Sequence, residues 1–273
     1  MGNVVLAHNT KAQSVWNAPA GSYDEISRTI GDAIDHAVTR LDPKPGERVL
    51  DLATGTGWAS RLVARRASGA RVVGADIADR LLDFARSAAT REGLEIDYRH
   101  ADAEQLPFGD REFDAVISTF GIMFVARPEV AAAELARIVK PGGRIVLATW
   151  RPEGGLFDFF GTMKKHMPAP PAGATPPPSP FDWGKVTRLE ELLASSFDVR
   201  VEEGTNVLRY QTGEQAWQLW VNHYGPTKSL AATLDDARRE ELHRDLVALH
   251  ETYATPLGFA MVRPYLVTRG VRK

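Results

Sequence analysis

Between residues 45 and 150 the chain alternates short apolar runs with longer stretches whose apolar positions follow helical spacing. The apolar runs span residues 48–52, 70–75, 96–100, 113–118 and 144–149. Most of these runs lack the polar alternation of a half-exposed strand, which is typical of a parallel sheet covered on both faces. Helical stretches separate most of them, so the pattern predicts a doubly wound α/β domain.

The helical stretches carry their own boundary signals. Two of them end before Gly69 and Gly93, and glycine suits the left-handed conformation found at helix C-termini. A third begins near Pro128, and the Lys140-Pro141-Gly142-Gly143 sequence after it predicts a turn before the fifth strand.

The flanking segments have weaker patterns. Residues 1–44 are predicted to be helical, residues 199–210 and 265–271 to be strands, and residues 214–255 to form helices between those strands. The simplest arrangement places this helical insertion, together with the N-terminal helices, over one edge of the sheet. Another predicted helix carries Leu156, Phe160, Met163 and Met167 at helical spacing, and we expect these side chains to lie mainly in the core.

Composition limits the possible functions. The chain has 273 residues, a formal net charge of −2 and no cysteine, which excludes disulfides, thiolate metal sites and a cysteine nucleophile. No long basic run attracts nucleic acid or an anionic membrane, and no apolar run is long enough to span a bilayer. We expect a soluble, cytoplasmic protein without a signal peptide, and the sequence gives no indication of its oligomeric state.

The first strand runs into a glycine-rich turn in the sequence VLDLATGTG, residues 49–57. This places Ala53 to Gly57 at the carboxyl end of a parallel strand, where open α/β sheets bind their ligands. Asp76 ends the second strand 19 residues after Gly57, a position from which a carboxylate can accept both hydroxyls of a ribose. Asp102 follows the third strand. These positions predict a site for a nucleoside-containing ligand.

Two ligand classes compete for this loop. A dinucleotide fingerprint needs a third small residue where Ser60 stands, and Asp51 inside the first strand would repel a pyrophosphate. The same carboxylate suits a ligand that carries an ammonium group. S-adenosylmethionine has an ammonium group, a ribose and an adenine, and it has no phosphate.

The blocks VLDLATGTG, VVGADIA, HADAEQLPF, FDAVISTFGIMF and RIVKPGGRIVLATW resemble, in this order, the class I S-adenosylmethionine-dependent methyltransferases. The resemblance is closest to the group with the quinone-biosynthesis and small-molecule methyltransferases. It implies a Rossmann-like, mostly parallel seven-stranded sheet of order 3-2-1-4-5-7-6. It also implies an N-terminal helical lid (1–44), a cofactor-binding core (45–150), and a remainder (151–273) with a helical acceptor cap inserted at about 211–258.

The resemblance also assigns residues to parts of the cofactor. Those expected to hold the methionine end are Asp51, Ala53, Thr54, Gly55 and Gly57. Asp76 would bind the ribose hydroxyls, and Ile77 would lie against the adenine ring. Asp102 would accept a hydrogen bond from the adenine amino group, while the backbone N–H of Ala103 would reach a ring nitrogen.

Further positions concern the reacting methyl group and the lid. Ser118 and Thr119 would line the sulfonium region, and the N-terminal segment with Trp16 and Tyr23 would close the pocket. Ala53 stands where the family has a glycine. We expect the extra methyl group to be tolerated if Ala53 keeps a negative φ.

The methyl acceptor is less defined. Ser118-Thr119-Phe120-Gly121 replaces the signature of amino-group methylation on nucleic-acid bases, and the lack of cysteine excludes cytosine C5 methylation. A small, partly apolar acceptor fits the aromatic cap, with O-, N- and C-methylation all open. His223 and Tyr224 are the best-placed candidates for a base.

Two histidines and a proline-rich segment lie outside these motifs. His243 and His250 are expected to be exposed, and no metal site is predicted. The proline-rich residues 168–180 are hypothesised to form a loop near the acceptor entrance. Two other functions stay open: a non-catalytic S-adenosylmethionine-binding protein, and a nicotinamide-dependent oxidoreductase.

Overall fold

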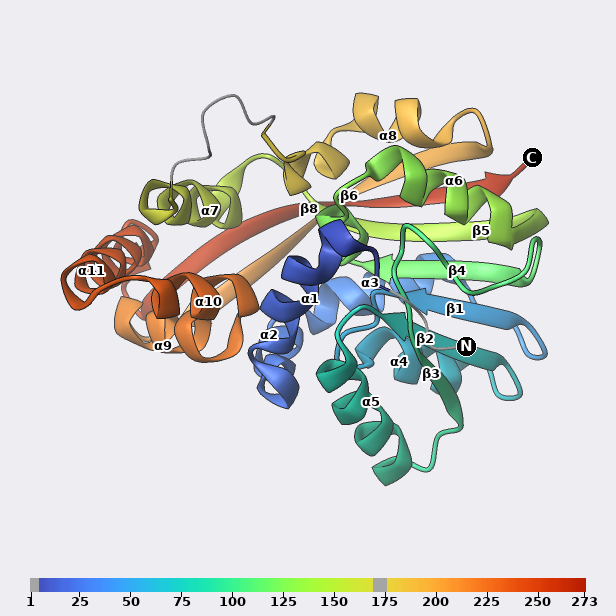
Figure 1. Cartoon of the computed structure of the whole chain (residues 1–273), viewed down its shortest axis with the longest axis horizontal. Coiled ribbons are helices and arrows are strands. Elements are labelled where there is room, and N and C mark those ends of the chain that lie inside the picture. Colours follow the sequence, from blue (N-terminus) through green and yellow to red (C-terminus); the bar gives the residue numbers. More distant parts are fainter. Residues whose placement is uncertain (1–4, 169–175) are drawn as a thin grey trace.

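The computed structural model describes residues 5–168 and 176–273, and its centre is a twisted sheet (Figure 1). Within these residues the sheet has eight strands, in the order β3-β2-β1-β4-β5-β8-β6, with β7 beside β8. Their bounds are β1 (Arg48–Leu52), β2 (Arg71–Asp76), β3 (Ile96–His100), β4 (Phe113–Thr119), β5 (Val139–Trp150), β6 (Phe197–Tyr210), β7 (Ala254–Thr255) and β8 (Gly258–Arg272). β1 to β5 pair in parallel, whereas β8 is antiparallel to both β5 and β6. The predicted order is confirmed, with β8 as the seventh strand and the two-residue β7 as an addition.

Helices cover both faces of the sheet. Their bounds are α1 (Thr10–Asn17), α2 (Asp24–Arg28), α3 (Gly31–Leu41), α4 (Trp58–Arg66), α5 (Asp79–Arg91), α6 (Pro128–Ile138), α7 (Gly154–His166), α8 (Val186–Leu193), α9 (Gly213–His223), α10 (Gly225–Thr233) and α11 (Asp236–Glu251). On one face α3 packs against α4, β4 and β5; on the other, α6 packs against β5 and α8 (Figure 1).

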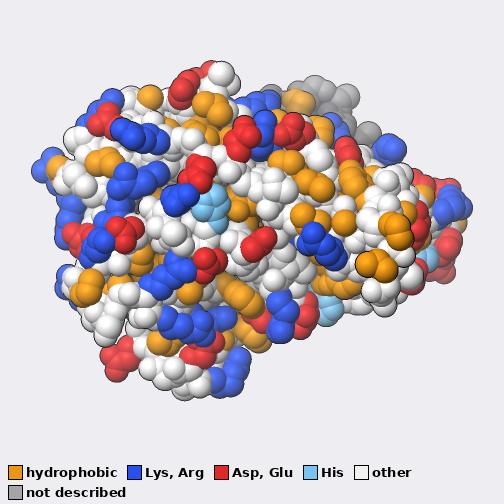
Figure 2. Space-filling view, turned by 180° about the vertical axis from the view of Figure 1, so that it is seen from behind, with side chains coloured by type: hydrophobic (Ala, Val, Ile, Leu, Met, Phe, Trp, Pro, Cys, Tyr) orange, Lys and Arg blue, Asp and Glu red, His pale blue; other side chains and the backbone are white. Residues whose placement is uncertain are grey.

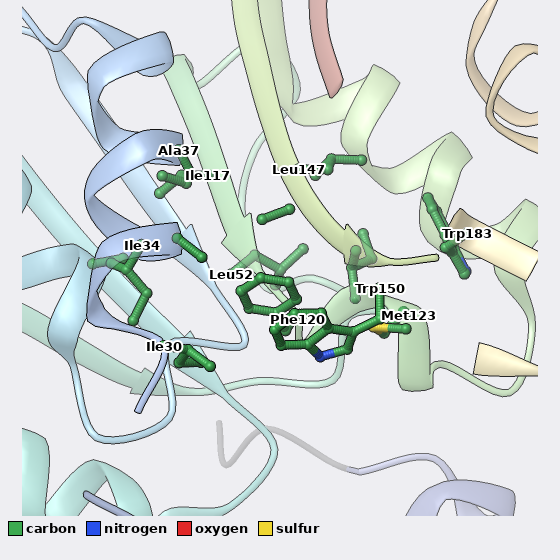
Figure 3. Packing of buried hydrophobic residues seen from close by; sticks show 14 of the residues in the cluster. Ile30, Ile34, Ala37, Leu52, Ile117, Phe120, Met123, Leu147, Trp150 and Trp183 are labelled. Atoms are coloured by element: carbon green, nitrogen blue, oxygen red, sulfur yellow. The ribbon is translucent and has the colours of Figure 1, made fainter. Parts of the chain in front are cut away.

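The core explains why the strands read as continuous apolar runs. Ile34 and Ala37 of α3 lie over the sheet beside Ile117 of β4, and Leu147 of β5 is buried with them (Figure 3). Val49 and Leu50 of β1 point to opposite faces of the sheet, and both are fully buried. Both faces of the central strands are therefore excluded from water, as the sequence pattern predicted.

The turn predicted at residues 140–143 is wrong, because these residues belong to β5. Val139 pairs with Phe113 and Arg144 pairs with Ala115, so β5 contains extra residues that shift the register as a bulge. Gly142 supplies the positive φ of 74° that such a bulge needs. The glycines therefore bend a continuous strand here and do not end it.

The last two long strands extend further than their sequence pattern indicated. β5 pairs with β8 from Tyr265 onward, whereas β6 pairs with β8 from Phe259. Residues 258–264 therefore form a two-stranded arm with β6 that projects beyond the sheet (Figure 1). An antiparallel pair satisfies its facing backbone groups without a third strand, so weak apolar alternation does not prevent it.

The arm carries the helical insertion predicted between the last two strands. α7 and α11 pack against β8, and α9 packs against α11 and α10. The N-terminal helices meet this insertion, with α1 against α10 and α2 against α9. Residues 169–175 of the predicted proline-rich loop lie outside the described residues.

Two predictions need correction, one of a buried side chain and one of an exposed side chain. Leu156 and Met163 of the expected core stripe are buried and Phe160 is half-buried, but Met167 just after α7 is 54% exposed. His250, expected to be exposed, is fully buried. Its Nδ1 lies 2.5 Å from the carbonyl oxygen of Leu246, and its Nε2 accepts a hydrogen bond from the Trp220 indole at 3.0 Å. Because both ring nitrogens have partners, the neutral imidazole can be buried at little cost.

The surface shows mixed charge on the face seen from behind in Figure 2, where Lys and Arg side chains lie interspersed with Asp and Glu. Within the described part of the chain, no helix is long and apolar enough to cross a membrane.

Candidate active site

A cavity lies at the carboxyl ends of the parallel strands, beneath the N-terminal helices. The predicted site residues that border it are Trp16, Tyr23, Ala53, Thr54, Gly55, Asp76, Ile77, Asp102, Ala103 and Thr119. Those that do not border it are Asp51, Gly57, Ser118, His223 and Tyr224. The sheet topology thus brings together ten positions from the ends of four strands and the N-terminal helices, spread along the sequence from residue 16 to residue 119.

The loop after β1 is built from left-handed residues. Ala53, Gly55 and Gly57 have φ values of 56°, 55° and 81°. The condition under which the extra methyl group was expected to be tolerated, a negative φ at Ala53, is therefore not met. The methyl group is accommodated because Gly121 faces it: a Cβ on Gly121 would lie 2.3 Å from the Ala53 Cβ. A left-handed alanine costs about 1–2 kcal/mol, so this loop stores some strain.

Gly57 has a structural role at the start of α4. A Cβ at this position would lie 2.5 Å from the Tyr98 hydroxyl and 3.0 Å from the Ala85 Cβ. The glycine therefore allows the loop to pack closely against β3 and α5. It does not border the cavity.

Asp51 lies behind the loop, fully buried in β1. Its Oδ2 accepts hydrogen bonds from the Thr54 hydroxyl at 2.5 Å and from the Ser60 backbone N–H at 2.8 Å, while Oδ1 has no partner among the described residues. Burial raises the pKa of Asp51 to about 7, against the opposing effect of these two bonds. Asp51 thus supports Thr54, which borders the cavity, from within the sheet.

Asp76 ends β2 with its carboxylate between two backbone donors. Oδ2 accepts from the Gly55 N–H and Oδ1 from the Ala78 N–H, each at 2.8 Å. Burial raises the pKa of Asp76, and the two backbone bonds oppose that shift. A carboxylate offers about four acceptor positions, so this one keeps capacity for donors from the cavity that it borders.

Asp102 is held by the N-terminal segment. The side-chain NH₂ of Asn9 donates to both of its oxygens, at 3.1 and 2.9 Å, and the Leu6 backbone N–H donates to Oδ2 at 3.1 Å. Asn9 also borders the cavity. Sequence reasoning missed Asn9, although Asn9, Ala12 and Trp16 share one helical face that borders the cavity.

The end of β4 places its two predicted residues differently. Ser118 is fully buried, and its hydroxyl accepts from the Ile122 N–H at 3.2 Å, which supports the turn after the strand. Thr119 borders the cavity, as does Phe120. Phe120 stacks on Trp150 with ring centroids 3.8 Å apart, so the cavity wall rests on the core (Figure 3).

Aromatic rings close the cavity on the side of the helices. The Trp16 ring packs edge-on against Phe124, Tyr224 and Tyr23, at centroid distances of 4.9, 5.9 and 6.0 Å. These rings come from α1, the turn after β4, the start of α10 and the segment before α2. The N-terminal helices, the core and the insertion therefore meet above the cavity.

The candidate bases lie outside the cavity lining. Tyr224 is buried behind Trp16 and Tyr23, and burial raises the pKa of both tyrosines. His223 has a buried Nδ1 without a partner among the described residues, and it does not border the cavity. Across residues 5–168 and 176–273 no group of three or more acidic, histidine or cysteine side chains could hold a metal ion.

The cavity lining includes residues that sequence reasoning did not identify. The apolar ones are Ala12, Ile30, Ile34, Leu52, Leu81, Ala101, Phe120, Ile122, Phe124 and Val125. Ile30 and Ile34 lie one helical turn apart, a spacing that could have indicated a shared face of α3. Asp76 and Asp102 are the charged residues among the described side chains that border the cavity, so its electrostatic character is anionic at one end and apolar elsewhere.

Comparisons with known proteins agree with this geometry. Residues 50–147 match the family described as a methyltransferase domain. The uncharacterized protein Rv1405c of Mycobacterium tuberculosis is 36% identical over 213 residues, which cover 77% of this chain and 76% of that protein. A demethylmenaquinone methyltransferase of Thermus thermophilus is 43% identical over 138 residues, covering 49% of this chain and 63% of the relative.

Solved structures share the fold at low sequence identity. The YcgJ protein of Bacillus subtilis aligns over 89% of this chain and 98% of its own, with a TM-score of 0.60 and 16% identity. A phosphoethanolamine N-methyltransferase of Haemonchus contortus, solved with phosphomonomethylethanolamine and S-adenosylhomocysteine, aligns over 88% of this chain and 52% of its own. Its TM-score is 0.55 at 17% identity.

Proposed function

Because the chain belongs to the class I S-adenosylmethionine-dependent methyltransferases, we propose that it transfers a methyl group from S-adenosylmethionine to a small, partly apolar acceptor. The observation that carries this proposal is the Asp76 carboxylate, which borders the cavity at the end of β2 beside the left-handed loop. A buried carboxylate with free acceptor capacity suits the two hydroxyls of a ribose.

The residues present fit this cofactor. Thr54 and Gly55, the latter without a Cβ, border the cavity where the methionine end would lie. Asp51 accepts a hydrogen bond from the Thr54 hydroxyl and so supports Thr54 from behind, without bordering the cavity itself. Ile77 and Ala103 offer apolar and backbone contacts to the adenine. The Haemonchus contortus enzyme, which shares the fold, was solved with S-adenosylhomocysteine.

The acceptor would occupy the aromatic side of the cavity. Trp16, Tyr23, Phe120 and Phe124 border it there, and no described Lys, Arg or His side chain does. An acceptor with a carboxylate or phosphate would lose its hydration without gaining a cationic partner, which is costly. An uncharged acceptor with a planar or apolar body fits these rings better. Demethylmenaquinone, named in the Thermus thermophilus relative, is one such compound to test.

The chain's own residues contribute alignment and exclusion of water. S-adenosylmethionine supplies a methyl group that is already activated for transfer. The aromatic rings above the cavity remove water and limit the poses of the acceptor. Because burial raises the pKa of Tyr23, that phenol is a poor base at neutral pH, and His223 does not border the cavity. We therefore expect the reacting atom of the acceptor to lose its proton without a general base from the protein.

The direct test is turnover with isotope-labelled S-adenosylmethionine and a panel of acceptors. The panel contains demethylmenaquinone in its reduced form, neutral phenols and amines, and matched carboxylates and phosphates. Methylation of a neutral member, with none of the anionic ones, supports the proposal. Tight binding of S-adenosylhomocysteine without turnover on any member would instead indicate a binding protein that is not a transferase.

A further inference from the structure

Phe120 has a backbone conformation that bulky side chains seldom adopt. It follows β4 with a φ of 60°, in the left-handed region, where the Cβ of an L-residue crowds the neighbouring carbonyl oxygen. Its N–H donates to the carbonyl oxygen of Ala148 at 2.8 Å, so the residue stays attached to β5. Strain of this kind persists only where the surrounding structure enforces it, and it clusters at functional sites. Phe120 fits that pattern because it borders the cavity.

Two aromatic rings enforce the position of the Phe120 ring. Trp150 at the end of β5 stacks on it, with centroids 3.8 Å apart and ring planes inclined by 14° (Figure 3). Tyr265 of β8 meets both rings edge-on, at centroid distances of 5.8 and 6.0 Å. Trp150 and Tyr265 are 6% and 4% exposed and do not border the cavity. They therefore act on the cavity only through Phe120.

Trp150 also contacts a buried cation that the proposed methyl transfer does not use. Arg263 of β8 is 1% exposed, and its guanidinium carbon lies 5.6 Å from the centroid of the Trp150 ring. Burial lowers the pKa of Arg263 to about 10, so the side chain remains charged at neutral pH. A cation within about 6 Å of an aromatic face is attracted to the ring, and more strongly where water is excluded. Arg263 thus stabilises Trp150 in its stacked position.

Hydrogen bonds fix the Arg263 guanidinium from the other side. Its Nη2 donates to the carbonyl oxygen of Thr29, at the end of α2, at 2.7 Å, while Nε has no partner among the described residues. Asn206 of β6 pairs with Arg263 in the two-stranded arm. Its side-chain NH₂ donates to the same Thr29 oxygen at 3.0 Å and to Asp32 Oδ1 at 2.5 Å. The bonds that place the cation are therefore separate from the aromatic stack.

We propose that Phe120 limits the size of the methyl acceptor and that Arg263 is a positioning residue, which holds the Phe120 ring through Trp150. This inference rests on the proposed methyl transfer. The acceptor packs against Phe120 on the aromatic side of the cavity. The ring keeps its strained conformation because Trp150, fixed by Arg263, stacks on it. The arm of β6 and β8 thus takes part in acceptor selection although none of its described residues borders the cavity.

The test measures selection among neutral acceptors of graded size. Phenol, 1-naphthol and 1-hydroxypyrene carry the same hydroxyl group on one, two and four fused rings. Equilibrium dialysis gives their affinities for the protein saturated with S-adenosylhomocysteine. We expect Phe120→Ala to raise the ratio of the 1-hydroxypyrene affinity to the phenol affinity about tenfold, because the cavity wall has lost its ring. Calorimetric titration of S-adenosylhomocysteine into each variant checks that the cofactor site is intact.

Arg263→Met replaces the guanidinium with an unbranched apolar side chain. We expect it to raise the same ratio about two- to fivefold, the effect of one cation–π contact. Arg263→Lys keeps a cation beside Trp150 and should stay nearer to the wild-type ratio. In the Phe120→Ala background Arg263→Met should have no further effect, because Arg263 acts through the Phe120 ring. A residue needed only for folding would not show this dependence on Phe120.

Two other substitutions in β6 and β8 are the controls. Asn206→Ala removes the hydrogen bonds to Thr29 and Asp32 and leaves the guanidinium in the chain. Arg269→Met removes an exposed arginine from the same strand as Arg263. Both controls are expected to keep the wild-type ratio. Asn206→Ala separates the aromatic stack from the link between α2 and α3, which Arg263 also contacts.

Four results would overturn the inference. An unchanged ratio in a folded Phe120→Ala protein would remove acceptor size from Phe120. Equal effects of Arg263→Met with and without the Phe120 ring, or an equal effect of Asn206→Ala, would show that Arg263 acts by another route. Binding of S-adenosylhomocysteine without any of the three hydroxyl compounds would mean that no acceptor site lies against Phe120. Absence of S-adenosylhomocysteine binding by the wild type would refute the proposed function as well, a result distinct from the others.

Discussion

Ala53 and Gly121 approach each other closely in the loop after β1. Substitutions at these two positions measure how much the strain in this loop lowers the free energy of unfolding. Replacing Ala53 by Gly removes a left-handed alanine and should raise the free energy of unfolding by about 0.5–1 kcal/mol, after the entropy of the added glycine is deducted. Gly121→Ala should lower it by about 1–3 kcal/mol, because the new Cβ would meet the Ala53 methyl group.

Combining the two substitutions gives the control. In the Ala53→Gly background, Gly121→Ala should cost about 1 kcal/mol less, because one partner of the clash is gone. Denaturant unfolding of the four proteins measures this coupling. Additive effects on the free energy of unfolding would mean that there is no steric clash between the side chains at positions 53 and 121.

Asp76 carries the ribose assignment. Asp76→Ala should weaken S-adenosylhomocysteine binding about a hundredfold, or ~3 kcal/mol, because a charged acceptor of two hydroxyls is lost. Asp83→Ala, on the exposed surface of α5, is the matched control and should bind as the wild type does. Calorimetry gives both affinities, with circular dichroism to confirm folding. An unchanged affinity in a folded Asp76→Ala protein would remove the ribose site from Asp76.

At the scale of single residues, the sequence locates the acidic residues of the site better than it locates the residues that hydrogen-bond to them. Asp76 and Asp102 follow strands, so position alone placed them at the cavity. Asn9 could not be found in this way, because its role depends on a contact with Asp102 across 93 residues. The positive φ of Ala53 could not be predicted from the sequence, because the glycine that makes room for its methyl group comes from another strand end.

At the scale of elements, His250 links α11 to α9 through Trp220. Burial lowers the pKa of His250 below its ordinary value, so the folded state takes up its proton less readily than the unfolded state. The stability that this group contributes is therefore complete above about pH 6.5 and is lost as the pH falls through its folded pKa. We expect the free energy of unfolding to decrease on acidification by up to about 1.4 kcal/mol per pH unit from this residue.

The measurement is the difference between wild type and His250→Gln in denaturant unfolding at about pH 7.5 and pH 5. The wild type should lose more stability than the variant between these values. Asp51, whose raised pKa of about 7 gives an opposite slope, contributes to both proteins and cancels in the subtraction. Parallel pH profiles would show that His250 does not titrate differently in the folded state.

Element types followed from the sequence where local patterns decide them. Continuous apolar runs identified the parallel strands, and their order is as expected. The bulge in β5 and the arm of β6 and β8 were missed, because each depends on pairing with a partner strand. A Pro-Gly-Gly sequence permits either a turn or a bulge, and only the neighbouring β4 selects between them.

At the scale of the whole molecule, Trp16 joins three parts of the chain. Its ring contacts Tyr23 of the N-terminal helices, Phe124 of the core and Tyr224 of the insertion. Trp16→Ala should release α1 and speed proteolytic cleavage within residues 6–17 severalfold. Lys11→Ala, on the exposed side of the same helix, is the control and should be cleaved at the wild-type rate. Equal cleavage of the two variants would show that α1 is held without these rings.

We propose that the loop after β1 and the carboxylate of Asp76 hold S-adenosylmethionine. The most direct measurement is calorimetric titration of S-adenosylmethionine, S-adenosylhomocysteine and NADH, each into the unmodified protein. We expect micromolar binding of the first two and none of NADH, because a pyrophosphate would meet the Asp76 carboxylate while no described Lys, Arg or His side chain borders the cavity. Preferential binding of NADH would contradict it, since the loop would then serve a dinucleotide.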